Sequence, residues 1–70
     1  MKITVLSKQG CKIEYKNEFG NQYEARFGFG GIAYMYKLNY KTSIYEPFGT
    51  TEIKSMPMPL LKIFKEICGL

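Results

Sequence analysis

The chain of 70 residues carries a net charge of +4, and 46% of its residues are hydrophobic and 16% aromatic. This composition excludes a disordered protein and is typical of a single small domain, which we expect to span residues 1–70. The sequence contains no His, Asp or Trp. Since His is the commonest general base and metal ligand, we expect a non-enzymatic protein that holds no cofactor and no metal.

Hydropathy along the chain also predicts where the protein acts. No apolar run approaches the roughly 18 residues of a membrane helix, so we expect no membrane span. The first ten residues lack the apolar centre of a signal peptide, which favours a cytoplasmic protein. The two cysteines, Cys11 and Cys68, are far apart in the sequence and lack the spacing of a metal site. We interpret them as small buried thiols rather than as metal ligands or a disulfide.

Two β-hairpins are predicted in the first 27 residues. Apolar and polar residues alternate over residues 1–7 and 11–17, and residues 8–10 and 18–20 each form a three-residue turn that ends in Gly. The expected cross-strand pairs on the apolar face are Ile3–Tyr15, Val5–Ile13, Tyr15–Tyr23 and Ile13–Ala25. On the other face, this register places Lys12 opposite Arg26 and Glu14 opposite Glu24.

The next hairpin turns at Gly30 and Gly31, because both glycines can adopt the positive φ of a two-residue type I′ turn. A turn at these residues predicts the same-face pairs Phe27–Tyr34, Ala25–Tyr36 and Tyr23–Leu38. The opposite face then carries an ion pair between Glu24 and Lys37. In this register the aromatic and the cationic side chains lie on opposite faces of the sheet.

After residue 38 the alternation continues to Ile44, so the fourth strand is either long or bends into a fifth strand near Lys41. Residues 46–49 read as a turn with Pro at its second position, and residues 50–54 as a short edge strand. Ser55 is the expected N-cap of a helix over residues 59–68 that stops at Gly69.

The predicted fold class is therefore α+β: an antiparallel β-meander of four to five strands, packed on one face by a single C-terminal α-helix. This outline resembles small sheet-plus-helix DNA-binding modules such as integrase arm-binding domains, which is a likeness of fold alone.

The outer face of this sheet is a candidate nucleic-acid-binding surface. It would hold six cations against two glutamates, which equals the whole net charge of the chain. Arg26 has the bidentate fork that suits guanine. The alternative is that these side chains simply form the solvated face of a sheet. The residues predicted to bind nucleic acid are Lys12, Lys16, Arg26 and Lys37.

The apolar face offers a second hypothesis. Four strands form a sheet about 19 Å wide, of which one helix covers about 10 Å, so part of the aromatic surface should stay uncovered. Such a face would suit a protein-interaction module, either a small inhibitor or regulator of a larger protein partner or a homodimer. Two alternatives remain. The aromatic face could stack the bases of single-stranded nucleic acid or sequester a nucleotide-like ligand, or the tyrosines could close over the core themselves. The predicted interface residues are Tyr34, Tyr36 and Tyr40.

Overall fold

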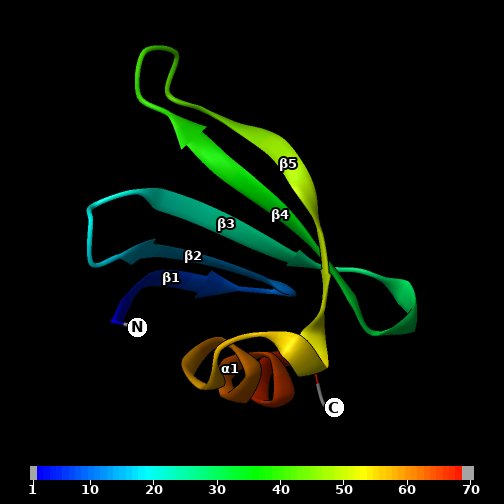
Figure 1. The fold of residues 1–70 in the computed structure, drawn as a ribbon. Coiled ribbons are helices and arrows are strands. Elements are labelled where there is room, and N and C mark those ends of the chain that lie inside the picture. The colour runs from blue at the N-terminus through cyan, green and yellow to red at the C-terminus, as the bar shows by residue number, and fades with distance from the viewer. Residues whose placement is uncertain (1, 69–70) are drawn as a thin grey trace.

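The computed structural model describes residues 2–68, and within this range it shows a five-stranded antiparallel sheet and one C-terminal α-helix, which confirms the predicted α+β class. Neighbouring strands in the sheet are consecutive in the sequence, as expected for a meander (Figure 1). The elements are β1 (Ile3–Gln9), β2 (Lys12–Asn17), β3 (Gln22–Phe27), the 3₁₀ turn η1 (Phe29–Gly31), β4 (Ile32–Asn39), β5 (Ile44–Glu52), the 3₁₀ turn η2 (Ile53–Ser55) and α1 (Met58–Cys68).

The core lies between one face of the sheet, here called the helix-side face, and α1. Leu60 and Phe64 of the helix are fully buried, and the ring of Phe64 lies 6.1 Å from the ring of Phe27, measured between centroids. The side chains that the sheet contributes to this core are Ile3, Val5, Ile13, Tyr15, Tyr23, Ala25, Phe27, Ala33 and Met35. The opposite surface of the sheet is called the outer face below.

The first hairpin differs from its predicted form. Its turn consists of Gly10 and Cys11, flanked by the pair Gln9–Lys12, and Leu6 forms a bulge that shifts the register of β1. Val5 therefore pairs with Tyr15, not with Ile13 as predicted. Because the bulge and the shorter turn compensate, Ile3, Val5, Ile13 and Tyr15 still reach the helix-side face. Cys11 is exposed in the turn, so its interpretation as a buried thiol is wrong.

The second hairpin confirms its predicted register, with Tyr15 opposite Tyr23 and Glu14 opposite Glu24. Its turn is organised by Asn17, whose side-chain Oδ1 accepts hydrogen bonds from the backbone N–H groups of Phe19 and Asn21, both at 3.0 Å. Such side-chain caps are the reason that Asn favours turns.

The third hairpin has a different register from the predicted one. A three-residue loop, η1, replaces the two-residue turn, and the loop is closed by a 2.7 Å hydrogen bond from the Gly28 N–H to the Ile32 carbonyl. Phe27 consequently pairs with Ala33, and Arg26 pairs with Tyr34. A shift of one residue transfers every side chain of β4 to the other face. The predicted separation of tyrosines from cations is therefore wrong for this strand.

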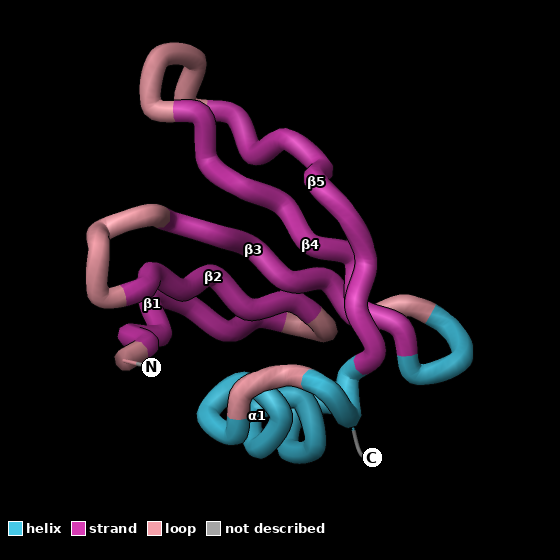
Figure 2. Tube along the Cα trace, in the orientation of Figure 1, coloured by secondary structure: helices cyan, strands magenta, loops and turns pink. Residues whose placement is uncertain are grey.

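The last strand is also longer than predicted. The chain reverses at residues 40–43, and the β4–β5 hairpin extends beyond the other strands (Figures 1 and 2). The predicted turn at residues 46–49 is instead part of β5, where Pro47 is tolerated because β5 is an edge strand and Phe48 forms a bulge beside it. Ser55 lies in η2 and is not the N-cap, since the carbonyl of Pro57 accepts the first helical N–H groups. The predicted stop at Gly69 lies outside the described residues.

Candidate nucleic-acid interface

One row of outer-face residues crosses four strands and combines cations with an aromatic ring. Lys12 on β2 pairs with Arg26 on β3, Arg26 with Tyr34 on β4, and Tyr34 with Thr50 on β5. We call these four residues the Arg26 row. Lys12 is exposed, the side chain of Arg26 is 49% exposed and Tyr34 is 48% exposed. All three are therefore accessible to a ligand on this face.

Arg26 is held in place by its neighbours. Its Nε donates to Oε1 of Glu24 in an ion pair, and its guanidinium carbon lies 4.2 Å from the centroid of the Tyr36 ring. The hydrogen bond to Glu24 is the main reason that the pKa of Arg26 is raised. Because the guanidinium is already bound and stacked, its orientation is fixed before any ligand arrives.

Glu24 is the acid that balances this cation, and it is only 3% exposed. Beyond it, the hydroxyl of Tyr45 accepts a 2.9 Å hydrogen bond from Nε2 of Gln22 and donates a 3.2 Å bond to Oε2 of Glu14. Burial is the main cause of the raised pKa of Tyr45. Tyr45 belongs to β5 and Glu14 to β2, which are about 14 Å apart in a flat sheet, so the sheet curls toward its outer face here. Sequence reasoning missed this bridge, although alternation along β5 could have placed Tyr45 on this face.

Tyr34 rests on the backbone of Gly28. A Cβ atom built at Gly28 would overlap the Tyr34 ring and lie 3.2 Å from the carbonyl oxygen of Ile32. Only Gly therefore allows the ring to lie across this part of β3 and the following loop. Tyr34 nevertheless remains 48% exposed.

The structure brings together some of the predicted site residues and separates others. Lys12, Lys16 and Arg26 share the outer face, and Tyr34 and Tyr36 join them there. Lys37 pairs with Tyr23 and so belongs to the helix-side face, contrary to the predicted placement. Tyr40 lies in the β4–β5 turn, where its hydroxyl donates a 2.6 Å hydrogen bond to the carbonyl of Gly20.

The charge of the outer face is lower than predicted. Among the outer-face residues of β2 and β3, three cations stand against Glu14 and Glu24, so the net charge there is +1. Lys37 lies on the other face and Lys41 in a turn. The charge of this surface is therefore concentrated at the Arg26 row and at Lys16, and it is not spread across the whole sheet.

Comparison with known proteins gives no guide to this surface. No protein-family model, curated protein or solved structure gives a significant match to the chain. Within the described range, no group of His, Cys, Asp or Glu residues is arranged to hold a metal ion. In the same range, α1 is too short to cross a membrane.

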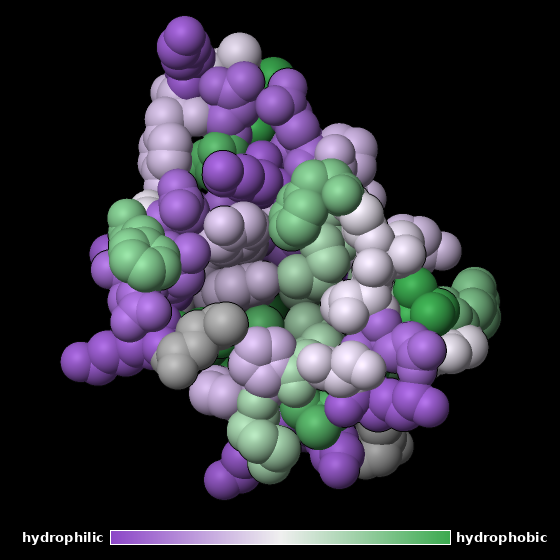
Figure 3. Space-filling model, in the orientation of Figure 1, coloured by the Kyte–Doolittle hydropathy of each residue, from purple (hydrophilic) through white to green (hydrophobic). Residues whose placement is uncertain are grey.

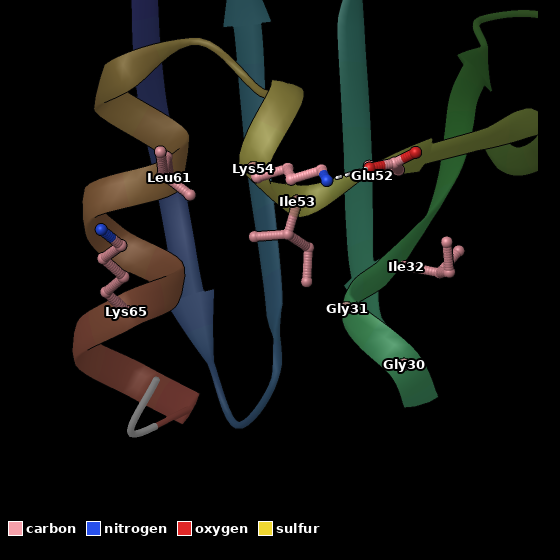
Figure 4. Close-up of a pocket in the computed structure, with 8 residues that line it drawn as sticks. All are labelled: Gly30, Gly31, Ile32, Glu52, Ile53, Lys54, Leu61 and Lys65. Carbon is pink, nitrogen blue, oxygen red and sulfur yellow. Dashed lines mark ion pairs between the residues drawn. The ribbon is translucent and has the colours of Figure 1, made fainter.

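A cavity of about 470 Å³ lies between η1, η2 and α1, and no residue of the Arg26 row lines it (Figure 4). Leu61 and Lys65 border it from the helix. Lys54 is directed toward Glu52, with 3.2 Å between Nζ and the carboxylate oxygen. The third charged residue of the lining, Lys65, gives the cavity a surplus of one positive charge.

A second hollow of about 320 Å³ lies on the helix-side face beside the start of α1, and Tyr15, Met35 and Phe48 line part of it. Burial raises the pKa of Tyr15 to about 12, so its phenol stays neutral at physiological pH. Phe48 is 57% exposed, so part of the aromatic surface on this side does remain uncovered. Figure 3 shows that hydrophobic side chains lie among hydrophilic ones across the middle of this view, while the β4–β5 turn is mostly hydrophilic.

Proposed function

We propose that this protein is a non-enzymatic binding module for nucleic acid and that the outer face of its sheet forms the binding surface. The single observation that supports this function is the Arg26 row, which sets two cations beside an exposed aromatic ring. Phosphates would be attracted by the cations, and sugar or base surfaces would contact the ring. Such a protein would act in the cytoplasm.

The acidic residues on this face do not prevent such binding. Glu24 is buried and already neutralised by Arg26, so it presents little charge to a ligand. Glu14 is half-buried and hydrogen-bonded to Tyr45. Lys12, Lys16 and Arg26 could all reach phosphates, but Arg26 is paired with Glu24 and adds little net charge. Binding that relies on the charges of the two lysines would be weak and salt-dependent.

The test is a measurement of affinity for short DNA and RNA oligonucleotides over a salt series. With the charges of Lys12 and Lys16, the slope of log K against log salt should be about −1.4 for single strands and about −1.8 for duplex. Lys12→Ala should reduce the steepness of that slope by nearly one. Lys62→Ala is the matched control, because Lys62 is an exposed lysine on α1, away from the outer face. No binding at low salt, or equal effects of the two variants, would refute the proposed function.

A second candidate function is protein interaction, with a larger partner or with a second copy of the chain. The observation in its favour is Phe29, which is fully exposed in the β3–β4 loop. A large apolar side chain in such a position suits an anchor that inserts into a partner. If the protein is a homodimer through this loop, light scattering should give twice the monomer mass, and Phe29→Ala should return it to the monomer. A monomeric mass at all concentrations would exclude the homodimer.

A further inference from the structure

Tyr34 is an exposed aromatic residue on the outer face, and its surroundings indicate what kind of ligand this face would bind. The ring lies so close to Gly28 that a Cβ atom at that residue would overlap the Cδ2–Cε2 edge of the ring. Nearly half of the side chain remains exposed, and in the described part of the chain its hydroxyl forms no hydrogen bond with another side chain or with the backbone. The fold therefore positions an aromatic surface that it does not bury.

We propose that the ligand of the outer face is single-stranded nucleic acid and that one base stacks on the exposed side of Tyr34. This inference rests on the proposed function and names its substrate class. Aromatic side chains on a cationic surface are the usual means by which proteins bind single strands. In a duplex each base is already stacked between its neighbours, so a fixed ring on a sheet has no free base surface to contact.

The cations of the row lie at suitable distances for the same nucleotide. Arg26 is one strand and Lys12 two strands away from Tyr34, which corresponds to about 5 Å and about 10 Å between backbones. A base stacked on Tyr34 thus leaves its own phosphate, or the next one, within reach of these side chains. The three residues together bind both the base and the backbone of one strand.

The same geometry predicts little sequence preference. In the proposed mode no side chain has to read a base edge, because Arg26, whose Nε donates to Glu24 and whose guanidinium lies over Tyr36, contacts the phosphate with its remaining N–H groups. Stacking on Tyr34 is available to any base because each has a π face. We therefore expect similar affinities for single strands of different sequence, with a modest preference for the bases that stack best.

The experiment compares a single strand with the duplex of the same length, using the full chain and labelled oligonucleotides at low salt. Tyr34→Ala should weaken single-strand binding by roughly 5- to 150-fold, since stacking of one base is worth that much. Its salt slope should stay unchanged because no charge is removed. Tyr34→Phe keeps the ring and should bind like the wild type. Tyr40→Ala is the matched control, because Tyr40 is also an exposed tyrosine but lies in the β4–β5 turn.

The possible results distinguish a failure of stacking on Tyr34 from a failure of nucleic-acid binding as a whole. If Lys12→Ala reduces the salt slope but Tyr34→Ala binds like the wild type, nucleic-acid binding stands and stacking on Tyr34 is refuted. Tighter binding of duplex than of single strand also refutes it, as does a Tyr34→Phe variant as weak as Tyr34→Ala. If the wild type binds neither form, both proposals fail. Far-UV circular dichroism of each variant verifies that a loss of affinity is not a loss of fold.

Discussion

Removal of the Arg26 guanidinium should destabilise the protein, because it leaves an acid buried without its partner. The Glu24 side chain is only 4% exposed, and Glu14 lies directly opposite on the neighbouring strand. Breaking a fully buried ion pair costs about 3–5 kcal/mol. The Arg26 side chain is 49% exposed, so water can partly replace it. We therefore expect Arg26→Ala to lower the free energy of unfolding by about 1–3 kcal/mol, as measured by urea denaturation at neutral pH.

A double variant tests whether the buried charge is the cause. Glu24→Gln together with Arg26→Ala removes both charges, so it should recover most of the stability that Arg26→Ala loses. If Arg26→Ala unfolds within about 0.5 kcal/mol of the wild type, or if the double variant is no more stable than Arg26→Ala, this reasoning is wrong. The same coupling has a practical consequence. Arg26→Ala by itself cannot separate lost phosphate contacts from lost fold, which is why Lys12 is the better probe of binding.

Three further substitutions test the core, the stability of the protein at high pH and the contact between Gly28 and Tyr34. Phe64→Ala should cost about 3–5 kcal/mol because Phe64 is fully buried, and circular dichroism should show a largely unfolded chain. Burial, and to a lesser extent Tyr23, raises the pKa of Tyr15 to about 12. As the pH rises, the Tyr15 phenol therefore loses its proton in the unfolded chain before it does so in the folded one. The free energy of unfolding should thus fall by roughly 2–3 kcal/mol between about pH 10 and pH 12. Tyr15→Phe should not show this loss when both proteins are unfolded with urea over the same pH range. Gly28→Ala should displace the Tyr34 ring and weaken single-strand binding while costing about 1 kcal/mol or less, because the extended backbone at Gly28 tolerates Ala.

The sequence predicted the fold class and the central hairpin because several local signals agreed there. In β2 and β3, Ile13, Tyr15, Tyr23 and Ala25 alternate with charged residues, so only one register buries all four. The turn between these strands ends in Gly20, which adopts φ 84°. Because the alternation and the turn predicted the same register, they also placed Lys12 opposite Arg26. That part of the candidate site was therefore predictable from the sequence.

The register of β4 could not be predicted because both of its faces are apolar. Tyr34 and Tyr36 alternate with Ala33 and Met35, so hydrophobic alternation favours neither set for the core. The space beneath α1 decides between them. Ala33 is fully buried in the cluster that also contains Phe64, and a tyrosine at that position would not fit beneath the helix. This constraint arises from packing between distant segments, and it is not visible in local turn signals.

The register that satisfies the core also determines what the outer face contains. Because the small side chain of Ala33 must face the helix, the tyrosines of β4 have to lie beside Arg26. Tyr36 has a structural role there, since its ring contacts the guanidinium that pairs with buried Glu24. Tyr34 lies against Gly28 and remains half exposed. Packing thus requires β4 to display an aromatic ring beside cations, and a stacking base would use that ring. Packing therefore accounts for where Tyr34 lies, and it leaves the exposed side of its ring free for a ligand.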